Sequence, residues 1–191
     1  MRRKPRCFGP AAAGLTLLLW CGARVWAGPP ELEMVLSPAS GALTGRMRIE
    51  GVQTVALEFD LLPGLQLDSV TVAGKSATVT ARGNRWRVPL PDAEQAGTLE
   101  LRWSGRLLGP PREAAGPRSD EPFLGEEGGY LPAGTGWMPG LSADWRRYRL
   151  KLVIDRGHRL AATGRLVEES VDGDIYSALV LGDGGAEPPS L

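Results

Sequence analysis

Apolar and polar residues alternate with a period of two along much of the chain, and this pattern restricts the possible folds more than any other feature. The alternation is clearest over residues 54–61, 98–103 and 147–154. A period of two sends successive side chains to opposite faces, which is typical of a half-buried β-strand. Weaker runs of the same kind lie at residues 32–36, 46–50, 160–167 and 175–181. No sustained 3.6-residue pattern follows residue 27, so we expect an all-β domain.

Turn residues separate these runs at short intervals. Ala73-Gly74 and Gly83-Asn84 lie between apolar runs, and glycine and asparagine tolerate the positive φ that tight hairpins need. We therefore predict a meander of three antiparallel strands over residues 70–90, which Pro89 and Pro91 end or place at a sheet edge. Strands at this spacing predict an antiparallel β-sandwich or open saddle of about eight to eleven short strands.

Residues 104–144 interrupt this rhythm and form one long, irregular crossing loop. Glycine and proline supply 15 of these 41 residues. Loops of this length are usually functional or disordered. Tyr130, Trp137 and Met138 in its second half are large apolar residues, and each would lose about 1.5–3 kcal/mol of burial energy if left in water. We expect them either to cap the open end of the sandwich or to form a surface for a partner domain or ligand.

The first 27 residues have the composition of a secretory signal peptide. Basic residues precede an apolar run over residues 11–23, which is shorter than the about 20 residues that span a bilayer. Small residues at −3 and −1 place the cleavage between Ala27 and Gly28. We expect a β-sandwich domain over residues 28–181, exported to the periplasm or secreted, with no transmembrane span after cleavage. An uncleaved leader would instead leave the protein membrane-associated.

The composition of the exported part excludes disulfides and thiolate metal ligands and argues against nucleic-acid binding. Both cysteines, Cys7 and Cys21, lie in the leader, so the remainder has no disulfide and no thiolate ligand for a metal. All 22 acidic residues but only 17 of the 22 basic residues follow residue 27, which gives this part a net charge of −5. A negative net charge argues against nucleic acid as a partner. The polar, proline-bearing residues 182–191 indicate a flexible tail.

Few residues point to catalysis. His158 is the single histidine and lies in an expected turn, whereas zinc hydrolases need two or three nitrogen ligands and a carboxylate. The Asp-Gly-Asp sequence at residues 172–174 favours a hairpin turn over a calcium site. Glu126 and Glu127 could act as an acid–base pair, but adjacent carboxylates in a glycine-rich loop are usually solvated. We assign no catalytic residue, no metal ligand and no cofactor to this chain.

Two blocks of the sequence resemble a known family. The first, residues 57–107, opens with LEFDLLPGLQLDSVTVAG and closes with LELRWSGRL, and the second, residues 128–169, opens with GGYLPAGTGWMP. The order of these features resembles the opening β-domain of the zinc aminopeptidases related to aminopeptidase N. That domain has an L-x-F-D-L strand, a V-x-S-V-x-V-x-G strand, a charged hairpin and a strand ending in W-S-G. The resemblance covers roughly residues 45–181.

The resemblance implies a β-saddle that packs on a thermolysin-like catalytic domain. In the family that later domain carries the His-Glu-x-x-His motif, so zinc would be held outside this chain. The family's Pro-Cys-x-Asp-Glu-Pro element is not met, and only Trp137 and Pro139 fall in its neighbourhood. Many members extend a glutamine or glutamate from this region toward the amino terminus of the substrate. Glu126 and Glu127 are the nearest candidates for this contact.

The preferred hypothesis is a non-catalytic amino-terminal domain of an exported zinc aminopeptidase-like protein, supplied as a truncated or split product. Tyr130, Trp137 and Met138 would then be anchors buried under a catalytic metallopeptidase domain, and would form an exposed apolar patch without it. One alternative is a free-standing exported β-sandwich that binds peptide, glycan or a partner protein. Another is a structural β-domain with no ligand of its own.

Overall fold

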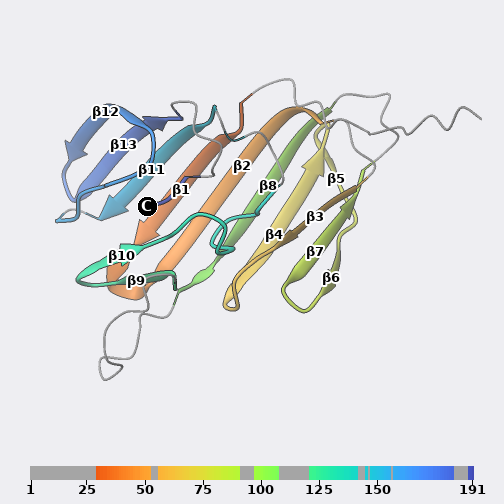
Figure 1. Ribbon diagram of the computed structural model, residues 1–191, viewed down its shortest axis with the longest axis horizontal. Helices are drawn as coiled ribbons and strands as arrows, with labels where there is room; N and C mark the ends of the chain where they lie inside the picture. The colour runs from red at the N-terminus through yellow and green to blue at the C-terminus, as the bar shows by residue number, and fades with distance from the viewer. Residues whose placement is uncertain are drawn as a thin grey trace, which may run out of the picture.

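The fold is all-β, as the alternation predicts. The computed structural model describes residues 29–52, 56–90, 97–107, 121–141, 145, 147–155, 157–182 and 189–191. These residues form thirteen strands and one short 3-10 turn, Pro38–Ser40. Eight strands build one large sheet in the order β12-β13-β11-β1-β2-β8-β4-β5 (Figure 1). They are β1 (Glu31–Ser37), β2 (Ala42–Val52), β4 (Leu65–Val72), β5 (Lys75–Ser76), β8 (Gly97–Arg106), β11 (Arg149–Asp155), β12 (Arg165–Asp172) and β13 (Ile175–Leu181).

Strand pairing in the large sheet is antiparallel except near its middle. There β1 and β11 run parallel, with Leu32 opposite Leu150 and Leu36 opposite Ile154. A parallel pair needs a long crossover connection. The crossover here includes β2, β8 and the second layer, so β11 returns beside β1 only after most of the domain has been built.

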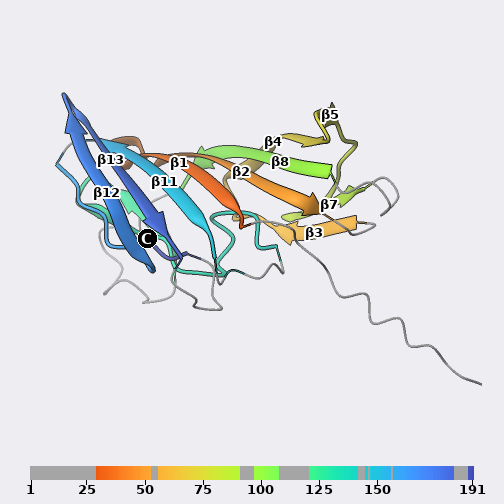
Figure 2. The ribbon, with the colours of Figure 1, turned by 90° about the horizontal axis from the view of Figure 1, so that it is seen from above.

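A three-stranded sheet forms a second layer at the β4–β8 end of the large sheet (Figure 2). Its strands are β3 (Ala56–Asp60), β6 (Thr80–Arg82) and β7 (Arg85–Pro89), with β7 in the middle. The meander predicted over residues 70–90 is wrong in its pairing, because β4 pairs with β5, β6 pairs with β7, and the chain changes sheet at residues 77–79. The turns lie where expected, with Gly74 at φ 76° and Gly83 at φ 62°.

The crossing segment holds more strand than its composition predicts. β8 extends to Arg106, and a short hairpin follows, made of β9 (Phe123–Gly125) and β10 (Gly128–Tyr130). These short strands raise the number of strands among the described residues above the expected eight to eleven. The strand expected over residues 160–167 is displaced, since β12 begins at Arg165. The Asp-Gly-Asp sequence does form a hairpin turn, between β12 and β13, with Gly173 at φ 56°.

The core lies on one face of the large sheet. Alternate residues of β1, β2, β8 and β11 are buried there, whereas most of their neighbours on the opposite face are polar or charged. Trp103 on β8 is fully buried, and its register partner on β2 is Gly45. A Cβ atom at Gly45 would lie 2.2 Å from the indole ring of Trp103. The glycine therefore makes the space that the indole occupies.

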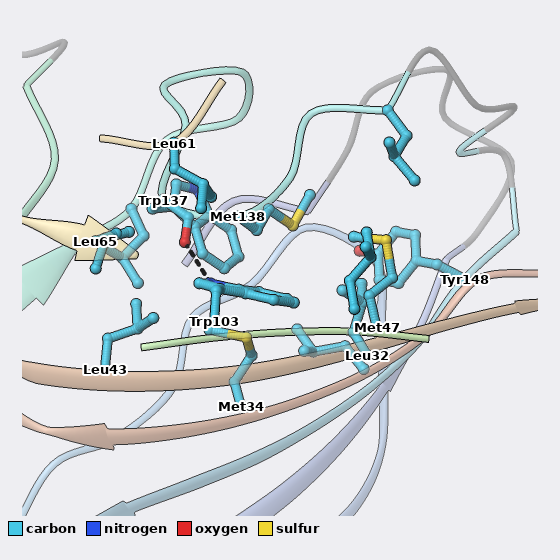
Figure 3. Packing of buried hydrophobic residues seen from close by; sticks show 14 of the residues in the cluster. Leu32, Met34, Leu43, Met47, Leu61, Leu65, Trp103, Trp137, Met138 and Tyr148 are labelled. Carbon is cyan, nitrogen blue, oxygen red and sulfur yellow. Dashed lines mark hydrogen bonds between the residues drawn. The ribbon is translucent and has the colours of Figure 1, made fainter. Parts of the chain in front are cut away.

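Trp103 also joins the large sheet to the crossing segment (Figure 3). Its Nε1 donates to the carbonyl oxygen of Trp137 at 3.0 Å, and Nε1 of Trp137 donates to the carbonyl oxygen of Pro132 at 2.9 Å. Both indole N–H groups are thus paired in a buried setting, where an unpaired donor would cost about 1–3 kcal/mol. The two tryptophans fasten the crossing segment to the large sheet.

Replacing Trp137 by alanine is expected to lower the free energy of unfolding by about 3–5 kcal/mol, because it removes a fully buried ring and leaves a cavity. Urea denaturation followed by tryptophan fluorescence and far-UV circular dichroism measures this change. Tyr130→Ala is the control, since that side chain is 40% exposed and should cost less than about 1 kcal/mol. Equal losses for the two variants would contradict this description of the core.

Candidate functional site

Trp137 and Met138 do not lie on the surface. Their exposed fractions are 1% and 3%, so the expectation that they form an exposed apolar patch is wrong. Both side chains complete the core of this chain. This agrees with the other expectation, in which the loop caps the open end of the sandwich. Gly136 allows this close approach: it has φ 84°, and its carbonyl accepts a hydrogen bond from Leu62 N at 2.9 Å. The glycines thus bring the segment against its own sheet.

Tyr130 is the expected anchor that stays accessible. It lies at the end of β10 with 40% of its surface exposed, beside a largely apolar cavity of about 470 Å³. That volume is within the range of small-ligand pockets, about 300–1,000 Å³. The walls of the cavity include Leu36, Leu124, Leu131, Leu152, Ile154, His158, Leu160, Thr163, Ser190 and Leu191.

Glu126 and Glu127 form the turn between β9 and β10, and both are exposed. The backbone carbonyl of Glu126 lies 3.1 Å from Nε2 of His158, whose Nδ1 lies 3.3 Å from the carbonyl oxygen of Asp155. The histidine thus links the hairpin to the end of β11, and its role here is structural. A contact of the two glutamates with a substrate stays a prediction.

Residues 189–191 are not a frayed end. Leu131 N donates to Leu191 O at 2.6 Å, Leu191 N donates to Leu131 O at 3.0 Å, and Pro189 is buried. The expectation of a flexible tail over residues 182–191 is therefore wrong for these three residues, and residues 183–188 lie outside the described part. The sequence carried little signal for this contact, because one leucine after a proline-rich stretch has no periodicity.

The outer face of the large sheet carries a network of charges across β1, β2 and β8. Arg46 contacts Glu100 at 2.7 Å and Glu33 at 3.2 Å, and Arg102 contacts Glu100 at 2.8 Å. The hydrogen bond from Arg46, aided by a second from Arg102, holds the pKa of Glu100 below its usual range. These residues occupy the outward positions of the alternation. Their pairing, however, depends on a strand register that the sequence does not show.

Three further expectations concern the signal cleavage site, metal ligands and a membrane span. Ala27 and Gly28, the expected cleavage site, lie outside the described residues. Among the residues that the structure does describe, no group of three or more histidine, cysteine, aspartate or glutamate side chains could hold a metal ion. No helix in that same part is long and apolar enough to cross a membrane.

Solved structures of M1 zinc metallopeptidases share this fold. The enzyme from Deinococcus radiodurans matches with a TM-score of 0.60 and 18% identity, over 80% of this chain and 37% of that one. A mutant of it bound to a Tyr-Ser-Ala substrate gives a TM-score of 0.61, 17% identity and coverages of 80% and 38%. A two-domain M1 zinc metallopeptidase mutant bound to L-arginine gives a TM-score of 0.60, 16% identity and the same coverages of 80% and 38%.

Sequence comparison alone finds no such relative, since no protein-family model and no curated protein matches the chain. The structural matches confirm the fold that the two sequence blocks implied. The chain spans less than two fifths of the length of the M1 enzymes that it matches. At identities of 16–18% the likeness is one of fold.

The charge network on the outer face predicts a pH-dependent contribution to stability. Because the pKa of Glu100 is lowered by folding, its contribution is present above the usual carboxylate pKa and is lost as the pH falls through the lowered value. Glu100→Gln should cost about 0.5–1 kcal/mol at pH 7 and much less near pH 3, measured by urea denaturation. Glu50→Gln, whose carboxylate pairs with Arg48 at a more exposed site, should cost less at both pH values. A cost for Glu100→Gln that does not change with pH would contradict the prediction.

Proposed function

We propose that this chain is a non-catalytic domain of an exported, M1-type zinc metallopeptidase-like protein, and that it packs on a zinc-bearing catalytic domain. The observation that carries the proposal is the shared fold, which extends over 80% of this chain and 37% of the enzyme chain. The whole sequence contains one histidine, whereas the His-Glu-x-x-His motif needs two. The metal site of the complete protein would therefore lie outside residues 1–191.

Export is part of this proposal. It is supported by the basic and apolar segments of the first 27 residues and by the small residues before Gly28. The absence of cysteine after residue 27 means that apolar burial, not disulfide bonding, stabilises the exported fold. Among the residues that the structure describes, thirty buried hydrophobic residues from both layers form one continuous cluster that can provide this stability.

The coding sequence that follows codon 191 provides a direct test. We expect it to encode, in frame, a thermolysin-like segment with the His-Glu-x-x-His motif. Sequencing of the transcript across this point measures the outcome. A stop codon directly after codon 191, with no separate gene for a catalytic partner nearby, would favour the free-standing binding module instead.

The docking surface for a catalytic domain must differ from the one that the sequence indicated, because Trp137 and Met138 are buried. Tyr130, at the end of β10, remains 40% exposed. Tyr130→Asp should weaken binding to a separately produced catalytic domain at least tenfold, by placing a charge in an apolar contact, while leaving the melting temperature nearly unchanged. Isothermal titration calorimetry and thermal melting measure the two effects.

Val35→Asp is the matched control for this experiment. Val35 is 48% exposed and lies on β1, so it receives the same charge away from the hairpin. Its binding should equal that of the wild-type chain. If both variants bind like the wild type, the hairpin is not the docking surface.

A further inference from the structure

Strand β12 forms one edge of the large sheet, since β13 is its single partner among the strands that the structure describes (Figure 1). Every residue of β12, Arg165–Asp172, is exposed. Its open side therefore presents backbone N–H and C=O groups that no described strand pairs. An exposed edge of this kind is a template for pairing with another chain.

Exposed apolar side chains gather at the same edge. Six large hydrophobic residues are exposed in the described part of the chain, and four of them lie on β12 or at the first position of β13. These four are Leu166, Val167, Val171 and Ile175. Single exposed hydrophobic residues are ordinary, whereas a group of them on one element marks an interaction surface.

The register with β13 shows which side chains of β12 share a face. Leu166 and Val171 lie opposite buried residues of β13, so both lie on the core side of the sheet. They share this face although an odd number of positions separates them, because a β-bulge at Val167 shifts the alternation by one. Glu169 lies between them on the same face, opposite the buried Ala178.

Charged residues of opposite sign occupy the two ends of β12. Arg165 is its first residue and Asp172 its last, and both lie on the outer face, with Glu168 and Ser170 between them. None of the ion pairs found among the described residues uses the charge of Arg165 or Asp172. Both charges are thus available to a partner.

This pattern complements itself when one copy of the strand is turned by half a revolution. In an antiparallel pair of β12 strands centred on Glu169, Arg165 lies opposite Asp172 of the second copy, and Leu166 lies opposite Val171. The two-fold axis repeats each of these pairs, as an isologous contact requires. A shift of the register by two residues would instead place Leu166 or Val171 opposite Glu169.

We propose that two copies of this chain associate through β12, paired antiparallel about Glu169, so that their large sheets become one continuous sheet. The two Glu169 side chains meet at the axis, and like charges directly opposite each other are unfavourable. The dimer is therefore weak and reversible. The inference is independent of the proposed function, because the docking surface for a catalytic domain was assigned to Tyr130 on β10, which takes no part in this contact.

An exchange of charges tests the pairing, with sedimentation equilibrium of the whole chain as the measurement. Arg165→Asp and Asp172→Arg each create two like-charge pairs in the dimer, so each variant should associate about tenfold more weakly than the wild-type chain. An equimolar mixture of the two variants should regain the wild-type affinity, because every introduced charge then meets an opposite one. Both positions are exposed, so the melting temperatures should stay close to that of the wild type.

Two adjacent glutamates provide a matched pair of further variants. Glu169→Gln removes the repulsion at the axis and should strengthen association about threefold. Glu168→Gln makes the same change on the outer face, opposite Ser170 of the second copy, and should leave the affinity unchanged. Arg82→Asp, on the exposed strand β6, repeats the change in net charge away from β12 and should also associate like the wild type.

Three results would overturn the proposal. One is a wild-type chain that stays monomeric up to roughly 1 mM, the range of weak association. Another is a mixture of Arg165→Asp and Asp172→Arg that associates no better than either variant alone. The third is an equal effect of Glu168→Gln and Glu169→Gln, which would mean that total charge, not the strand register, controls association.

Discussion

The contact between Trp103 and Trp137 is the interaction on which the rest of the structure depends. A sheet with one apolar face needs a second layer, and here that layer is partly an irregular segment with little secondary structure of its own. The hydrogen bond from Trp103 to the Trp137 carbonyl, together with the space left by Gly45, fixes where that segment crosses the sheet.

This use of the crossing segment changes which surfaces are available for function. Because Trp137 and Met138 are part of the core, Tyr130 is the one of the three expected anchors that a partner can still reach, and it lies beside the cavity at the hairpin. His158 fastens the hairpin to β11, and residues 189–191 close the gap beside Leu131. Elements distant in sequence therefore meet beside the short hairpin.

The sequence-based predictions were accurate where the interaction involved residues close together in the chain, and less accurate where it involved residues far apart. The alternation over residues 147–154 located β11 well, since burial of every second residue is a local property of a half-exposed strand. The turns at Gly74 and Gly83 were also located, because a positive φ favours glycine whatever the surroundings. Pairing was less accessible: the alternation did not reveal that β5 and β6 belong to different sheets, or that β1 and β11 run parallel.

The sequence by itself determined the class of the fold, the absence of cysteine after residue 27, and the presence of large apolar side chains within a glycine-rich segment. These three properties can be read from the composition and from the spacing of apolar residues, both of which are local features of the sequence. Only the tertiary structure decided that Trp137 faces inward, that Arg46 meets Glu100, and that Ser190 and Leu191 lie between Leu131 and Thr163. The partners in these contacts are 27 to 60 positions apart along the chain, and the inward position of Trp137 depends on one such contact, its hydrogen bond with Trp103. Their formation requires the register of whole strands, and no local pattern contains that information.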